Sequence, residues 1–215
     1  HQYDNFTLEF LGVRKEQFAE LVTYKNTAKL NKEGAKLLGL REGIPVVPAH
    51  PDGALNQIGN YDNRPGIMTL SIGTSGAMRM IAETPILPKG GELWCYCGVE
   101  RWISGAAISG ACNCINWFKN RLGQKLSYEE LEKGSDPKAD VPVFLPFLFG
   151  ERCPGWHDSS MAGFYGVKAS HGVKEFYQSI QMGILFNLYQ CYGILRSENK
   201  TPSQIIVSGG ISNSE

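Results

Sequence analysis

Four apolar segments follow one another between residues 67 and 108 with no helical pattern between them. They are Ile67–Ile72, Ala77–Ile81, Leu93–Val99 and Arg101–Ile108. Only the turn Gly73–Gly76 separates the first two segments, and only Glu100 separates the last two. Strands joined by tight turns pair antiparallel, whereas parallel strands need a longer crossover that is usually a helix. The run therefore predicts an antiparallel or mixed sheet and excludes a pure β-α-β repeat.

Helical patterns mark the segments that would cover such a sheet. In residues 173–197 the apolar side chains recur every three or four positions, which gives one wide apolar face. After this helix, the run 204–207 predicts a buried strand that ends at Ser208-Gly209-Gly210. The same reasoning predicts helical structure at 6–42, 54–58, 112–122 and 128–133, and a short buried strand at 44–49. These segments predict an α/β fold in which helices flank a mixed sheet.

The charge balance excludes several classes of partner. The 215 residues carry 21 Lys and Arg against 21 Asp and Glu, so the formal net charge is zero. Proteins that bind nucleic acid or anionic membranes need a basic excess, and we expect neither partner. No apolar stretch approaches the roughly 18–20 residues of a membrane helix, and no leader sequence precedes the first element, so we expect a cytoplasmic protein.

Six cysteines raise the alternative of a thiol–metal module. Two pairs, Cys95/Cys97 and Cys112/Cys114, have the spacing C-x-C. Structural zinc sites usually show two to four residues between paired cysteines. The pattern favours reduced, mostly buried thiols, and we predict no metal site in this chain.

Asp52 is a candidate general base. It follows the apolar run 44–49 and precedes the predicted helix 54–58, so its carboxylate could face a cleft and accept a proton from a bound hydroxyl. The alternative is that Asp52 caps this helix. The turn-rich segment 59–66 that follows predicts a domain boundary.

Two glycine-rich turns are candidate anion sites. In Gly73-Thr74-Ser75-Gly76, backbone N–H groups and two hydroxyls could converge on a phosphate, although an ordinary hairpin is the alternative. The spacing of a P-loop is absent and no Lys follows. Gly209-Gly210 after the last strand would allow a ligand to approach the backbone closely. On the loop that follows 141–149, Glu151 and Arg152 could contact a polar substrate, join two domains or form a surface ion pair.

These pieces, taken in order, resemble the FGGY carbohydrate kinases, and among them the gluconate kinases most. The segments that carry the resemblance are 48–53, 70–79, 144–156, 162–167 and 207–215. The resemblance implies a two-domain, actin-like ATPase fold of ribonuclease H type that uses ATP and Mg²⁺. It implies that residues 1–62 are the tail of the first domain and 63–215 most of the second, so that both chain ends are cut edges.

The resemblance also implies roles for single residues. Asp52 would be the catalytic base, and the turn Gly73, Thr74, Ser75 and Gly76 would contact the ATP phosphates, with Thr74 foremost. Nucleotide contacts would come from Asn116, Gly209, Gly210 and Ser214, and contacts with substrate or between domains from Gly53, Glu151 and Arg152. Two departures stand out: Ala111-Cys112 replaces a pair of glycines, and Gln181-Met182-Gly183 replaces an apolar-Glu-Gly triplet.

The predicted activity is phosphorylation of gluconate to 6-phosphogluconate, with this chain inactive by itself. A kinase acting on a ketose or polyol such as xylulose, and a non-catalytic actin-like nucleotide-binding module, are the alternatives. The expected partner is a small sugar acid, and a homodimer is compatible with the resemblance.

Overall fold

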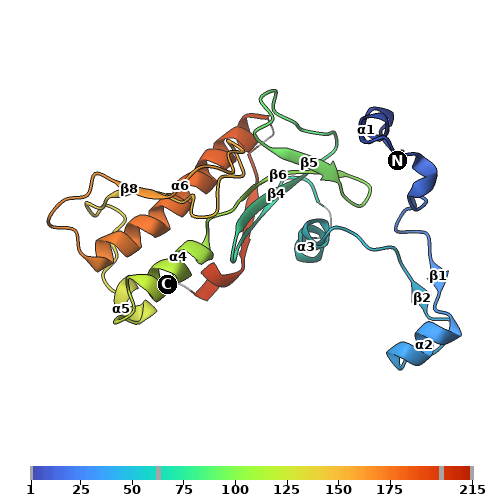
Figure 1. Ribbon diagram of the computed structural model, residues 1–215, viewed down its shortest axis with the longest axis horizontal. Helices are drawn as coiled ribbons and strands as arrows, with labels where there is room; N and C mark the ends of the chain where they lie inside the picture. Colours follow the sequence, from blue (N-terminus) through green and yellow to red (C-terminus); the bar gives the residue numbers. More distant parts are fainter. Residues whose placement is uncertain (1, 62–63, 199–200, 214–215) are drawn as a thin grey trace. The chain divides into compact units, whose positions relative to one another are not determined.

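The computed structural model describes residues 2–61, 64–198 and 201–213. The chain divides into two compact units, His1–Asp52 and Gly53–Glu215 (Figure 1). Helix α3, Asp52–Tyr61, starts at the last residue of the first unit. The boundary predicted between family domains, at 62/63, follows this helix and stays a prediction.

The first unit consists of short elements. They are α1 (Asn5–Leu11), the 3-10 helix η1 (Lys15–Gln17), β1 (Ala28–Lys29), α2 (Lys32–Leu38) and β2 (Pro45–Val46). The prediction of helical structure across 6–42 is wrong for most of that segment. Gly12 ends α1 with a left-handed φ of 64°, and Asn31 begins α2 by accepting a hydrogen bond from the Gly34 N–H. A left-handed residue terminates a helix, so the apolar periodicity across it does not describe one element.

The buried strand predicted at 44–49 is also wrong. β2 holds two residues and pairs antiparallel with β1. Val46 and Val47 are 44% and 60% exposed. An apolar run is buried only where other elements cover it, and the neighbouring strand here is equally short.

The second unit is built on a five-stranded mixed sheet, as predicted, with the order β5-β6-β4-β3-β9. Its strands are β3 (Ile67–Ile72), β4 (Gly76–Ala82), β5 (Trp94–Cys97), β6 (Trp102–Ile108) and β9 (Gln204–Ser208). β3 and β9 run parallel, and all other neighbours run antiparallel. The parallel strand returns after the long helix, in accord with the crossover that parallel pairing needs.

Helices pack on both faces of this sheet. Helices α4 (Cys112–Arg121), α5 (Tyr128–Glu132) and α6 (Val173–Glu198) contribute to the main core on one face. There, Met78 and Met80 of β4 lie in one cluster with Ile180 and Leu188 of the predicted long helix α6. On the other face, Ala54 of α3 packs with Ile81 and Ile103. Successive residues of β4 therefore place their side chains in the cores on opposite faces of the sheet.

A second, two-stranded sheet packs on α6. It consists of β7 (Val143–Leu145) and β8 (Gly163–Tyr165), which pair antiparallel. The Phe164 ring lies 4.8 Å from that of Phe144 and 4.9 Å from that of Phe176 at the ring centroids. A Cβ on Gly183 would lie 2.4 Å from the Phe144 carbonyl oxygen, so this glycine allows α6 to approach β7.

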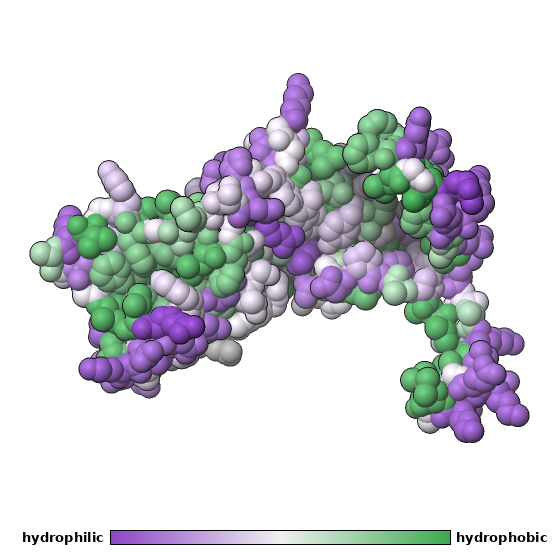
Figure 2. Space-filling model, viewed as in Figure 1, coloured by the Kyte–Doolittle hydropathy of each residue, from purple (hydrophilic) through white to green (hydrophobic). Residues whose placement is uncertain are grey.

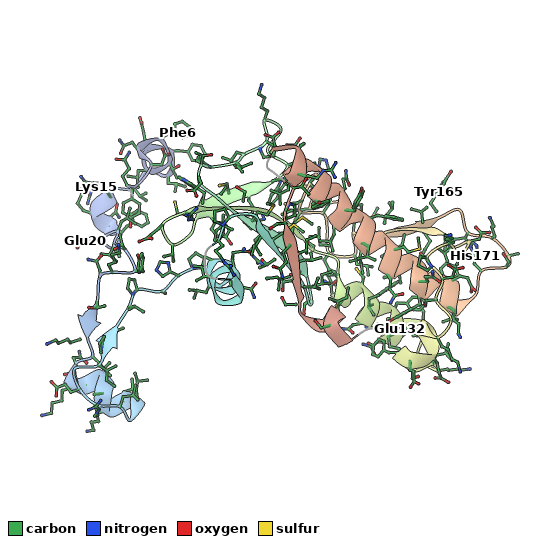
Figure 3. All side chains as sticks on the ribbon, turned by 180° about the vertical axis from the view of Figure 1, so that it is seen from behind. Phe6, Lys15, Glu20, Glu132, Tyr165 and His171 are labelled. Carbon is green, nitrogen blue, oxygen red and sulfur yellow. The ribbon has the colours of Figure 1, made fainter. Side chains whose placement is uncertain are left out.

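Apolar side chains also remain on the surface around α6 and β8 (Figure 2). Tyr165, labelled in Figure 3 with His171, is 78% exposed, and Phe186 of α6 is 58% exposed. The opposite side of α6 forms the core with the sheet.

Candidate active site

The turn between β3 and β4 ends two central strands, as the sequence predicts. A hydrogen bond of 3.0 Å from the Gly73 N–H to the Ser75 carbonyl closes it. Thr74 and Ser75 are exposed, and a Cβ built on Gly73 would meet no atom within 4 Å. The turn therefore offers two accessible hydroxyls beside open space, which is the form of a site that takes an anion.

Gly209 and Gly210 lie at the same edge of the sheet. β9 runs parallel to β3 with Ser208 opposite Ser71, so both strands end together. Gly209 has a φ of 98°, and a Cβ there would lie 2.4 Å from the Ile72 carbonyl oxygen. The 3-10 helix η2 (Gly210–Asn213) follows at once. No side chain fits at Gly209 without moving backbone, so this glycine sets the approach of η2 to the turn.

Helix α4 completes this edge through contacts that the sequence did not signal. The Cys112 N–H donates to the Gly73 carbonyl at 2.9 Å, and the Asn113 N–H to the Thr74 carbonyl at 3.2 Å. The first donors of the helix thus hold the turn. Ala111-Cys112, which stands where the resemblance predicts a pair of glycines, lies at the start of this helix. Ala111 is fully buried. A Cβ on Gly210 would lie 3.6 Å from the Cys112 sulfur. Burial raises the pKa of the Cys112 thiol.

The remaining predicted nucleotide residues differ in position. Asn116 lies one turn beyond Cys112 on α4, is exposed, and accepts a hydrogen bond of 2.9 Å from the Tyr128 hydroxyl. Ser214 lies outside the described residues. The structure thus brings together Gly73–Gly76, Gly209-Gly210 and the start of α4, all within the second unit.

Asp52 is the first residue of α3 and is exposed. Within the described residues, its carboxylate has no hydrogen bond or ion pair, including the helix cap that was the alternative. Gly53 follows and is buried. A Cβ at this position would lie only 2.7 Å from the Tyr96 hydroxyl and 2.9 Å from Nε of Arg79, so a larger residue would not fit without displacing these side chains. Glycine at this position lets the start of α3 pack directly on β4 and β5.

Glu151 is engaged within its own loop. Its carboxylate accepts hydrogen bonds from the Gly155 N–H at 3.2 Å and the Ser160 hydroxyl at 3.4 Å. The Trp156 indole anchors the same loop by donating to the Gly91 carbonyl at 2.9 Å. Arg152 is exposed, and in the described part of the chain it forms no ion pair with Glu151. These contacts order the loop and leave the predicted substrate contact of both residues as a prediction.

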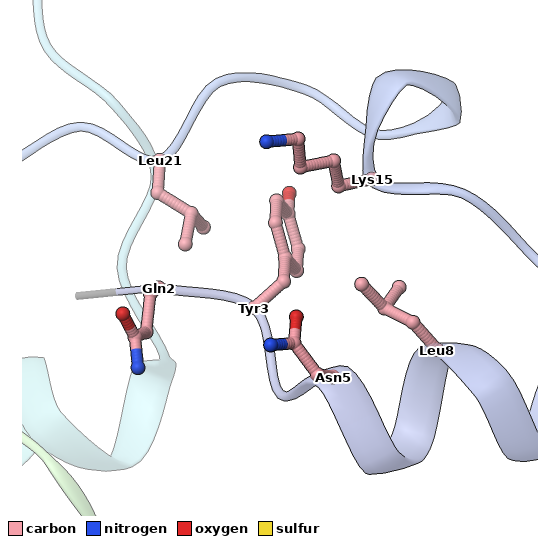
Figure 4. A pocket seen from close by; sticks show the side chains of 6 residues that line it. All are labelled: Gln2, Tyr3, Asn5, Leu8, Lys15 and Leu21. Atoms are coloured by element: carbon pink, nitrogen blue, oxygen red, sulfur yellow. The ribbon is translucent and has the colours of Figure 1, made fainter.

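The first unit contains a shallow pocket of about 290 Å³ (Figure 4). Its lining residues are Gln2, Tyr3, Asn5, Leu8, Lys15 and Leu21. None of them is among the predicted site residues. The six cysteines are free thiols, and the described ranges hold no group of three or more His, Cys, Asp or Glu side chains placed to bind a metal.

Comparison with known proteins decides the family. Residues 68–215 match the C-terminal domain of the FGGY family of carbohydrate kinases. The chain belongs to this family. Among its FGGY relatives, a gluconokinase from Bacillus licheniformis is 28% identical over 230 residues, which cover 99% of this chain and 45% of the relative. The chain thus spans less than half the length of this relative.

Solved structures of FGGY kinases share the fold. The xylulose kinase of Lactobacillus acidophilus superimposes with a TM-score of 0.91 at 26% identity, over 100% of this chain and 45% of that one. The gluconate kinase of the same organism gives 0.88 at 26% identity, over 99% and 44%. The predicted actin-like ATPase fold is confirmed. No helix in the described ranges has the length and apolar character needed to cross a membrane.

Proposed function

We propose that the whole protein transfers the γ-phosphoryl group of ATP to a hydroxyl of a sugar acid, converting gluconate to 6-phosphogluconate. The observation that carries the proposal is the meeting of the β3–β4 turn, Gly209-Gly210 and the start of α4 at one edge of the sheet. Membership of the FGGY family supports the reaction class. Phosphoryl transfer depends mainly on positioning and charge stabilisation, which such an edge can supply.

In this mechanism the hydroxyls of Thr74 and Ser75 and the backbone of their turn hold the ATP phosphates. Gly209 and Gly210 leave room for the nucleoside, with Asn116 and Ser214 as further contacts. Asp52 accepts the proton of the acceptor hydroxyl while that oxygen forms its bond to the γ-phosphorus. The bond from the γ-phosphorus to the bridging oxygen breaks, and ADP leaves with its electron pair.

Mg²⁺ bound with ATP would neutralise charge on the phosphates, as is normal for sugar kinases of this family. A Cβ on Gly73 would meet no atom within 4 Å, which is compatible with a phosphate beside this turn, and we assign no Mg²⁺ ligand to this chain. Gly53, Glu151 and Arg152 stay predictions for substrate or interdomain contacts, as do a cytoplasmic location and a homodimer.

The choice of gluconate as the substrate rests on two sequence motifs. The segments Ser71–Ala77 and Gly150–Trp156 favour a gluconate kinase, and a gluconokinase is among the relatives. A xylulose kinase is among the structural neighbours at equal identity, so a kinase for a ketose or polyol is the second candidate.

The test is an ADP-coupled assay of the full-length protein against sugar acids, pentuloses and polyols. We expect gluconate-dependent ADP release, and a loss of about 10²–10⁴-fold in kcat for Asp52→Asn with ATP binding retained. Asp136→Asn is the matched control, because the new amide keeps the oxygen that accepts from the Lys138 N–H. The base assignment is wrong if Asp52→Asn keeps most of the turnover. ATP binding without turnover on any acceptor would favour the non-catalytic module.

A further inference from the structure

Arg79 lies in the middle of β4 on the face that α3 covers. Its neighbours Met78 and Met80 belong to the main core, and alternate residues of a strand point to opposite faces. Two of its guanidinium nitrogens, Nε and Nη1, are shielded from solvent and have no hydrogen-bond partner in the part of the chain that the structure describes. A shielded, unpaired cation is costly unless a partner arrives.

The described residues opposite Arg79 on the neighbouring strands bring no carboxylate to it. On β3, Thr69 lies opposite Arg79, and its hydroxyl donates to Oε1 of Gln57 at 2.5 Å; both groups are neutral and give the guanidinium no charge to pair with. On β6 the opposite residue is Gly105, which has no side chain. The ion pairs among described residues are Lys15 with Glu16, Arg101 with Glu83 and Lys168 with Asp140. None of them includes Arg79.

The guanidinium faces the start of α3. Nε and Nη2 lie 2.9 and 3.2 Å from the position that a Cβ on Gly53 would take. The amino end of a helix carries partial positive charge, and the Asp52 carboxylate in the first turn of α3 forms no ion pair with Arg79 among the described residues. Both features favour an anion, and a guanidinium matches the two oxygens of a carboxylate in geometry.

We propose that Arg79 binds the carboxylate of the sugar acid and so selects it over neutral acceptors. This inference rests on the proposed function. Arg79 lies three residues along β4 from Gly76, roughly 10 Å at about 3.3 Å per residue. A carboxylate at Arg79 would therefore lie at the opposite end of the acceptor from a hydroxyl that reacts beside the phosphate turn. A neutral ketose gives Arg79 no charge to pair with.

The experiment compares Arg79→Gln and Arg79→Lys in the full-length protein. Gluconate and sorbitol, in which an alcohol replaces the carboxylate, are assayed as acceptors and as ligands by calorimetry. For Arg79→Gln we expect KM and Kd for gluconate to rise roughly 10–150-fold with little change in kcat, the range for a hydrogen bond to a charged group. Sorbitol binding should be unchanged, Arg79→Lys should be intermediate, and added guanidinium should restore part of the gluconate affinity. Arg101→Gln is the control, because it removes an arginine that directly precedes β6 and pairs with Glu83.

Equal losses for gluconate and sorbitol, or an unchanged gluconate KM, would overturn the assignment of Arg79. If Arg79→Gln does not fold, Arg79→Lys carries the comparison, because it keeps the charge and loses the paired geometry. A wild-type protein that phosphorylates no sugar acid refutes the proposed function itself. A wild-type protein active on gluconate whose Arg79 variants do not discriminate refutes only this inference.

Discussion

Gly209→Ala tests whether the close approach of η2 to the β3–β4 turn shapes the nucleotide site. A Cβ at this residue meets the carbonyl oxygen of Ile72 at 2.4 Å, and real Cβ atoms do not come closer than about 3.0 Å to such atoms. This oxygen belongs to the backbone of the last residue of β3, so the clash cannot be relieved by rotation of a side chain. Alanine must also adopt a φ of 98°.

Both costs can be estimated. The left-handed conformation costs about 1–2 kcal/mol for a residue with a Cβ, and overpacking costs about 1–3 kcal/mol. We expect Gly209→Ala to lower the free energy of unfolding by roughly 2–5 kcal/mol. Gly134→Ala is the matched control, because Gly134 has a φ of 81° but nothing lies within 4 Å of its Cβ position. It should lose only the conformational part, about 1–2 kcal/mol.

Urea denaturation of both variants measures the difference, and titration with a fluorescent ATP analogue measures the site. Gly209→Ala should bind the nucleotide more weakly, because η2 must move away from the turn, whereas Gly134→Ala should bind it as the wild type does. Equal free energies of unfolding for the two variants would refute the argument from the Ile72 carbonyl. A destabilised Gly209→Ala with unchanged nucleotide affinity would refute the placement of the nucleotide at this edge.

Two further predictions concern the thiols. ATP should protect Cys112, which lies beside Gly210, from alkylation by iodoacetamide, but should leave the exposed Cys97 reactive. Peptide mapping measures the alkylation of both thiols. Equal protection of the two would contradict the placement of the nucleotide beside Gly210. Burial raises the pKa of Cys114 and of Cys191 from 9.0 to about 12, so the folded state favours the protonated thiols. Their contribution to stability is complete below pH 9 and is lost as the pH rises from 9 towards 12, by up to about 1.4 kcal/mol per pH unit for each thiol. Urea denaturation across this range measures the slope, which Cys191→Ala should reduce; an unchanged slope would count against burial as the cause.

Local sequence patterns were sufficient for most of the second unit, although they did not predict β7, which lies in a segment expected to be irregular, or β8. The strands β3, β4 and β6 and the long helix α6 were predicted close to their observed bounds, because each carries its own periodicity over many residues. The turn Gly73–Gly76 was predicted for the same reason, since its glycines and hydroxyls are local features. In the first unit the patterns misled, because its apolar runs have few covering elements and Gly12 divides the predicted helical segment.

The sequence by itself determined the family, the sheet-and-helix order and the identity of the glycine turns, because motifs and periodicity are properties of neighbouring residues. Only the tertiary structure showed that the first N–H groups of α4 hold the turn. It also showed that Arg79 faces Gly53, with two shielded nitrogens that have no hydrogen-bond partner among the described residues. These contacts join residues far apart in the chain. They depend on strand register and on which face of the sheet each side chain occupies, and packing of the whole unit sets both.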